Sequence, residues 1–237
     1  MKKVVKGSGS RVLVGTLVAG AVVAGSKILL DKFWKVRDPT RATPQDQELM
    51  YSPADGLVTH IRRIENGRIR SDLLNEDLGL EELTGLEHGP DVEGWLIGIY
   101  VGLLDVRFTV APVSGTLASS VDVPAKAKEE LLSTLEGVQL LAGQIPELVG
   151  RHAQLESGKL TLTLESEALK VIMVHHLLED TDVKMLVSSG ESVQVGQKLC
   201  FLEREGLVEL VLLREDLEIL LSVGDRVQAG LSELARV

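Results

Sequence analysis

Short hydrophobic runs with the periodicity of β-strands fill most of the chain after residue 49. Apolar and polar residues alternate in Lys159–Ser166, KLTLTLES, which is typical of a strand with one buried face. Leu169–Val174, LKVIMV, is apolar at nearly every position and predicts a strand buried on both faces. Further strand-like runs occur at Met50–Ile64, Gly94–Val110 and Thr116–Val123. The pattern therefore predicts a mainly β domain of the α+β class.

One region departs from the strand pattern and predicts a helical insertion. In Lys126–Val149 the apolar residues recur at helical spacing, at Leu131, Leu135, Val138, Leu141 or Ala142, and Ile145. The acidic pair Glu129 and Glu130 suits a helix N-terminus. We expect one helix here, packed across the sheet. The polar, acidic, glycine-broken segment Glu65–Pro90 is interpreted as a surface loop that has room for one weak hairpin or helical turn.

The first 30 residues contain a hydrophobic segment that follows a basic start. Met1–Arg11 carries four basic residues and no acid. Val12–Leu30 is 19 residues long, and as a helix it would span about 28 Å, close to the hydrocarbon thickness of a bilayer. We expect residues 1–30 to form a single-pass membrane anchor, with a cleaved signal peptide as the alternative. Residues 31–48 then form a juxtamembrane linker, and residues 49–237 form the folded domain.

Composition restricts the classes of function. The net charge of −10 disfavours a nucleic-acid-binding protein, because phosphate contacts require a basic surface. The single cysteine, Cys200, excludes an intrachain disulfide and a cysteine-rich metal site. In the apolar run LCFL it is expected to be a small buried hydrophobe. His175 and His176 are adjacent on a predicted strand and should point to opposite faces, so we expect no metal site there.

A motif recurs in the C-terminal part of the chain. Gly190–Gly196 and Gly224–Gly230 both have the pattern G-x-x-V-x-x-G, 34 residues apart. Paired glycines permit tight turns around a short strand, which suits the flattened hairpin sandwich of lipoyl- and biotinyl-type domains. Those domains carry a modified lysine at a hairpin tip. Lys184 before Met185 is an insufficient match, so the carrier interpretation is weak.

Candidate chemistry lies in Ile97–Gly115, IGIYVGLLDVRFTVAPVSG, and in Ser52–Gly56, SPADG, since strand-to-turn junctions usually present functional groups. Two further motifs flank these segments: Phe33–Arg41, FWKVRDPTR, before them and Val223–Gly230, VGDRVQAG, after them. Together the four motifs resemble the phosphatidylserine decarboxylase family. LDVRFTVAPVSG is similar to the family's LDVHVNRAPVSG-like sequence. The resemblance covers roughly residues 33–64, 94–117 and 185–237, and it implies a β-rich decarboxylase-like fold.

The resemblance implies chemistry carried by a pyruvoyl group. In the family, the serine of a Gly-Ser pair cleaves the chain and becomes a pyruvoyl, which forms a Schiff base with the substrate amine and accepts electrons as carbon dioxide leaves. Asp55 matches the acid of SPADG, and Asp105 matches the acid before the family histidine. The histidine falls on Arg107, which cannot act as a base near neutral pH. The serine falls on Gly206, which has no hydroxyl, so no pyruvoyl cofactor is expected.

Three functions follow from these matches and departures. We expect a membrane-anchored, non-catalytic relative that binds membrane lipid, in particular a phospholipid headgroup, or partners phospholipid-synthesising enzymes. Arg107, with Asp55 and Asp105, forms the candidate ligand site, although an ion pair of Arg107 with Asp105 or Asp55 is an equally good interpretation. The alternatives are an active decarboxylase making phosphatidylethanolamine, and a scaffold or carrier-like module that binds a protein partner or a second copy of the chain.

Overall fold

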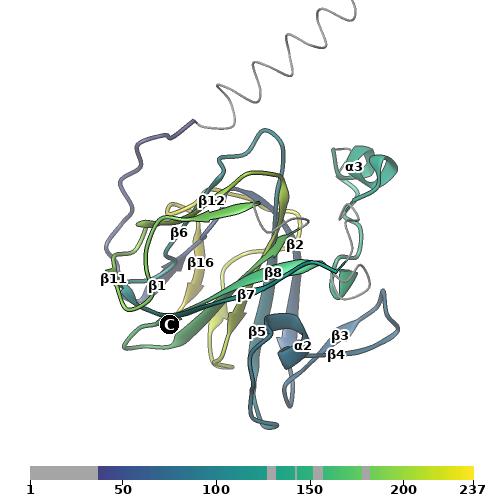
Figure 1. Ribbon diagram of the computed structural model, residues 1–237, viewed down its shortest axis with the longest axis horizontal. Helices are drawn as coiled ribbons and strands as arrows, with labels where there is room; N and C mark the ends of the chain where they lie inside the picture. The colour runs from purple at the N-terminus through teal and green to yellow at the C-terminus, as the bar shows by residue number, and fades with distance from the viewer. Residues whose placement is uncertain (1–36, 127–131, 142, 152–156, 178–181) are drawn as a thin grey trace, which may run out of the picture. The chain divides into compact units, whose positions relative to one another are not determined.

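The computed structural model describes residues 37–126, 132–141, 143–151, 157–177 and 182–237. Antiparallel sheets dominate this part of the chain, which confirms the mainly β prediction (Figure 1). Residues Asp38–Val237 form one compact unit. Among the described residues, no helix is long and apolar enough to cross a membrane. The predicted anchor, residues 1–30, lies outside the described residues and stays a prediction.

The central sheet has eight strands in the order β11-β7-β8-β9-β13-β5-β2-β15. In chain order these are β2 Gly56–Ile64, β5 Gly94–Val101, β7 Gly115–Val123, β8 Gly158–Glu165, β9 Lys170–Leu177, β11 Ser192–Val193, β13 Gly206–Leu212 and β15 Arg226–Val227. Three smaller sheets are formed by β1 Leu49–Tyr51 with β16 Glu233–Arg236 and β14 Glu218–Ile219, by β10 Val183–Met185 with β12 Lys198–Leu202 and β6 Phe108–Val110, and by β3 Arg68–Ser71 with β4 Glu76–Gly79.

The middle of the central sheet is buried on both faces, as the sequence predicts for β9. Val171 and Met173 belong to one hydrophobic cluster, whereas Ile172 and Val174 belong to another. Successive side chains of a strand point to opposite faces, so the two clusters lie on opposite sides of the sheet. Burial of this kind explains why the strand reads as a continuous apolar run.

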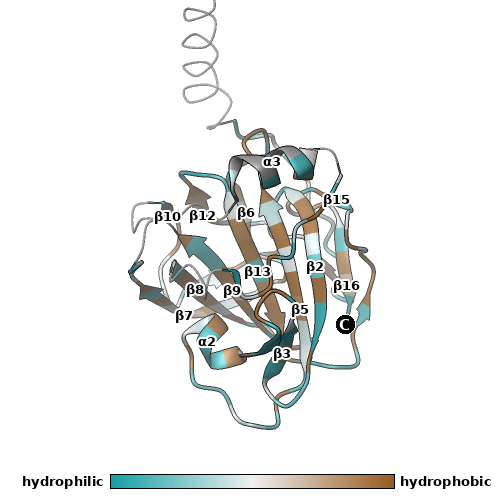
Figure 2. Cartoon of the chain, turned by 90° about the vertical axis from the view of Figure 1, so that its right-hand side faces the viewer, coloured by the Kyte–Doolittle hydropathy of each residue, from teal (hydrophilic) through white to brown (hydrophobic). Residues whose placement is uncertain are grey.

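The hairpin or helical turn allowed for in Glu65–Pro90 is present, but the interpretation of the segment as a surface loop is wrong. This segment forms the β3–β4 hairpin and the short helix α2 (Leu80–Thr84), which ends at Gly85 in a left-handed conformation. Its apolar side chains complete the second hydrophobic cluster and are almost fully buried: Ile69, Leu78, Leu80 and Leu83. Figure 2 shows β3 as mostly hydrophilic. Its two arginines are exposed, and the apolar residue between them faces the core. The segment is therefore part of the core.

The predicted helix within Lys126–Val149 is shorter than expected. Helix α3 spans Thr134–Leu141. It starts at a capping box, in which the Glu136 N–H is bonded to the Ser133 hydroxyl and the Glu136 carboxylate accepts from the Ser133 N–H. It ends before Gly143, whose φ is +81°. The acidic pair Glu129–Glu130 lies outside the described residues.

The repeated glycine motif forms the two edges of the central sheet. Its first copy contains β11 and its second copy contains β15, which are the outermost strands. The last glycines of the two copies, Gly196 and Gly230, both pack against Thr43. A Cβ on Gly230 would lie 3.6 Å from the Gly196 Cα, so the edges of the sheet approach each other. The glycine turns are as expected, while the lipoyl-type sandwich stays a prediction.

Candidate functional site

Four positions matched to the family lie at one end of the central sheet: Asp55, Asp105, Arg107 and Gly206. The strands β2, β5 and β13 are antiparallel neighbours, and their register aligns Leu57 with Tyr100 and Tyr100 with Leu207. At this edge, the start of β2 and the start of β13 therefore lie beside the end of β5. Asp55 immediately precedes β2, Gly206 is the first residue of β13, and Asp105 and Arg107 lie in the turn between β5 and β6. The fold thus brings together positions that are far apart in the sequence.

Asp55 is held by two distant segments of the chain. Its carboxylate accepts hydrogen bonds from both terminal nitrogens of Arg41, with Nη2 at 2.8 Å from Oδ2. It also accepts one from the Ala229 N–H, at 2.8 Å. The carboxylate raises the pKa of Arg41 through this hydrogen bond, against the effect of burial. Asp55 is almost fully buried, and these bonds occupy both of its oxygens.

Asp105 stabilises the turn between β5 and β6. Its Oδ2 accepts a hydrogen bond from the Gly102 N–H at 2.8 Å. Its Oδ1 lies 3.1 Å from Nη1 of Arg226, an exposed residue of β15. The Asp105 carboxylate thereby links the turn before Arg107 to the edge of the sheet.

The Arg107 guanidinium is buried and does not pair with either aspartate. Arg107 is 3% exposed, and its Nε and Nη1 atoms have no hydrogen-bond partner among the described residues. Burial lowers the pKa of Arg107, while Glu205 and other nearby groups oppose this effect. Arg41 is the ion-pair partner of Asp55, and Arg226 is that of Asp105. The expected pairing of Arg107 with Asp105 or Asp55 is therefore wrong.

Gly206 begins β13 and is not required there by packing. A Cβ on this glycine would meet only the His176 carbonyl oxygen, at 3.5 Å, which is an ordinary contact. Gly206 is not among the glycines with positive φ. A serine would fit the same backbone, so the fold does not require a glycine at this position.

Comparison with known proteins identifies the family. The sequence model of phosphatidylserine decarboxylase matches residues 32–235. The chain belongs to the phosphatidylserine decarboxylase family. This result confirms the resemblance of the sequence motifs, and the match also covers the divergent middle of the chain.

Several phosphatidylserine decarboxylase proenzymes are similar to this family member. The one from Symbiobacterium thermophilum is 26% identical over 218 residues, covering 92% of this chain and 83% of the relative. The one from Carboxydothermus hydrogenoformans is 24% identical and covers 85% of this chain and 77% of the relative. The one from Novosphingobium aromaticivorans is 30% identical over 130 residues, and there the match spans about half the length of each protein.

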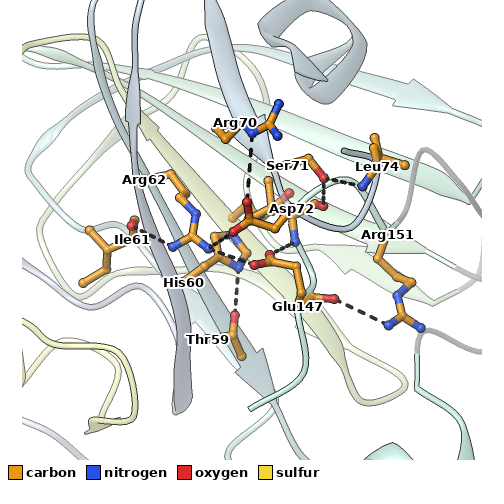
Figure 3. Close-up of polar contacts among 12 residues, drawn as sticks. Thr59, His60, Ile61, Arg62, Arg70, Ser71, Asp72, Leu74, Glu147 and Arg151 are labelled. Carbon is orange, nitrogen blue, oxygen red and sulfur yellow. Dashed lines mark hydrogen bonds and ion pairs between the residues drawn. The ribbon is translucent and has the colours of Figure 1, made fainter. Parts of the chain in front are cut away.

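A buried polar bridge near the site was missed by the sequence analysis. Glu209, in the middle of β13, is fully buried. Its Oε1 lies 2.9 Å from Nε2 of His60, and its Oε2 contacts Nε2 of His176. His60 comes from β2 and His176 from β9, so the bridge crosses four neighbouring strands. Figure 3 shows Thr59 beside His60. The Thr59 hydroxyl lies 3.1 Å from Nδ1 of the His60 ring.

Gly98 of β5 makes this bridge possible. It lies opposite both His60 and Glu209 in the register of the sheet. A Cβ on Gly98 would stand 2.1 to 2.6 Å from three atoms of the His60 ring. The imidazole thus passes over the glycine to reach the carboxylate one strand further on. The sequence signal was a lone acid inside the apolar run LVELVL, but its partners lie far away in the chain.

The bridge joins one carboxylate to two imidazole rings. Each histidine contacts a different oxygen of Glu209. In the described part of the chain, no group of three or more His, Cys, Asp or Glu residues has a metal-binding arrangement. A buried carboxylate requires such partners, since an unpaired buried charge is strongly destabilising.

Cys200 is buried, as the sequence predicts, whereas His175 is also buried and is not the polar strand-end residue that we expected. His175 contacts the Thr109 hydroxyl at 3.2 Å and the Leu160 carbonyl oxygen at 3.3 Å, whereas His176 reaches Glu209. Burial lowers the pKa of His175 to about 4. Burial also raises the pKa of the Cys200 thiol to about 12, so it remains protonated at neutral pH.

Replacing Gly98 by alanine should destabilise the fold by about 1–3 kcal/mol, because the new methyl group overlaps the His60 ring. Urea unfolding of the full chain measures this change. Gly79→Ala is the matched control, since nothing lies within 4 Å of a Cβ there. In a His60→Ala background the ring is gone, so Gly98→Ala should have little further effect. An equal loss in both backgrounds would contradict the proposed overlap.

Lowering the pH should destabilise the protein through His175. The unfolded chain protonates this histidine below about pH 6.5, whereas the folded chain does so only near pH 4. Stability is therefore lost as the pH falls from 6.5 to 4, by up to about 3 kcal/mol. Urea unfolding at several pH values measures the slope. His175→Gln should flatten it, because glutamine retains an amide for Thr109 and does not titrate; an unchanged slope would refute the assignment.

Proposed function

We propose that this protein is a non-catalytic member of the phosphatidylserine decarboxylase family that acts in phospholipid metabolism by binding an anionic headgroup. The observation that carries the first part is Gly206. The family chemistry needs a serine hydroxyl at this position, and no serine occurs between Ser192 and Ser222. A pyruvoyl group does not fit a glycine, so no catalytic step is assigned to one.

The replacement of the family histidine supports the same conclusion. Arg107 stands where the family has its histidine, and a guanidinium remains protonated under ordinary conditions, even when burial lowers its pKa. It supplies a fixed positive charge in place of a group that transfers protons. Asp55 is also engaged, because Arg41 and Ala229 occupy its oxygens. Proton transfer at this end of the sheet thus has neither its base nor its nucleophile.

Headgroup binding is supported by the hydrogen-bond donors of Arg107. A buried guanidinium with two nitrogens lacking partners is costly, and an anion would satisfy it. Arginine binds phosphate and carboxylate groups bidentately, and both occur in phospholipid headgroups. Asp105 contributes by fixing the turn that leads to Arg107, and Asp55 by fixing the segment around Arg41. In this proposal the anchor at residues 1–30 keeps the domain at the membrane, near its ligand.

Intact mass of the purified full chain tests the loss of self-processing. We expect no break between Glu205 and Gly206, so the C-terminal segment should remain attached and the whole chain should give one species near 25.7 kDa. Removal of a signal peptide would shorten only the N-terminal end and is easily distinguished. Two fragments, with the smaller one starting at residue 206 and blocked to N-terminal sequencing, would show that the processing chemistry survives.

Arg107→Met should weaken headgroup binding at least about ten-fold, since hydrogen bonds to charged groups contribute about 1.5–3 kcal/mol. Calorimetric titration of the full chain in a nonionic detergent with glycerophospho-L-serine measures the affinity. The variant should be at least as stable as the parent, because methionine fills the site without a buried charge. Arg70→Met, which removes an exposed arginine of β3, is the control. Equal affinity in all three proteins would exclude Arg107 from the site.

A further inference from the structure

A cavity lies on the opposite side of β6 from Arg107. It has a volume of about 190 Å³ and lies between the N-terminal segment Asp38–Thr43, called the strap here, and strands β6 and β12. Val106, Phe108 and Val110 line it, whereas Arg107 does not. This follows from the alternation of side chains along a strand. The cavity is smaller than the roughly 300–1,000 Å³ of pockets for drug-sized ligands, so it suits a small polar group.

Two cations line this cavity, and they are held very differently. Arg41 is mostly buried and is fixed by its paired hydrogen bonds to Asp55 and a 3.1 Å bond to the Ala229 carbonyl oxygen. Lys198 forms an ion pair with Asp38, but the two side chains are 41% and 46% exposed. The ammonium group of Lys198 also lies 4.7 Å from the centre of the Phe108 ring.

The Asp38–Lys198 pair places an anionic oxygen against a cation at the wall of the cavity. The Asp38 carboxylate already places an oxygen against Lys198, beside the fixed charge of Arg41. Exposed ion pairs contribute little to stability, so the carboxylate is easily replaced. Without Asp38, the charged side chains lining the cavity are both positive. Thr40 and Thr43 of the strap add hydroxyl groups to the wall.

We propose that this cavity binds a phosphate-type anion, either free phosphate or the phosphate of a lipid headgroup, which takes the place of Asp38 at Lys198. Arg41 contributes a preformed positive charge and keeps its bonds to Asp55. The strap stays attached, because Thr43 remains packed against Gly196 and Gly230. The site uses none of the three candidate residues Asp55, Asp105 and Arg107 as a ligand, so it goes beyond the proposed function.

Two substitutions with opposite expected effects on phosphate affinity test this site in the full chain. Lys198→Met should weaken the binding of inorganic phosphate at least about ten-fold, because it removes the charge that contacts the anion. Asp38→Asn should strengthen it about two- to five-fold, because it removes the competing carboxylate of an exposed pair. Calorimetric titrations with inorganic phosphate and with glycerophospho-L-serine measure both effects. Tighter binding of the ester than of free phosphate identifies a headgroup as the ligand, and the reverse identifies free phosphate.

The matched controls are Lys184→Met and Glu218→Gln, which disrupt the exposed pairs Lys184–Glu203 and Glu218–Arg236 elsewhere. Both should bind as the parent does. Unchanged affinity in Lys198→Met, weaker or equal affinity in Asp38→Asn, or no binding of either probe by the parent would overturn the site. The two sites lie on opposite sides of β6 and are tested by different variants, Lys198→Met here and Arg107→Met for the proposed function, so a failure of this inference is separable from a failure of the proposed function.

Discussion

The buried carboxylate of Asp55 joins three parts of the chain that are far apart in sequence. It precedes β2, it receives two hydrogen bonds from Arg41 in the strap, and it receives one from the N–H of Ala229 beside β15. A buried carboxylate is tolerated only with such partners, so the strap and the edge of the sheet must lie where they do. The same bonds occupy the acid that the family match brings to the site.

β6 separates two environments: the buried guanidinium of Arg107 on one side, and the cavity with Arg41 and Lys198 on the other. Both contain cationic side chains, although the net charge of the protein is −10. Our proposals of anionic ligands for these two regions rest on the local placement of cations, not on overall charge.

Much of the fold follows from periodicity, but contacts between distant residues do not. Alternation along Lys159–Ser166 and the apolar run around Met173 predict strands that the structure contains. The place of the β3–β4 hairpin in the core was missed because the hairpin contributes only single apolar residues, such as Ile69, to it. The partners of Asp55 and Asp105 depend on which strand ends meet, and no local pattern encodes this. Glu209 stands out as a buried charge, yet only the sheet order identifies its two histidines.

Decarboxylation itself gives the most direct test of whether this sheet end has lost its chemistry. Carbon dioxide release is measured from phosphatidylserine labelled at the serine carboxyl carbon, with the full chain in detergent micelles and the Symbiobacterium thermophilum relative assayed alongside. We expect no release above the protein-free level, because Gly206 supplies no nucleophile. Release by this chain that cyanoborohydride abolishes would reveal a Schiff-base intermediate and contradict the loss of catalysis.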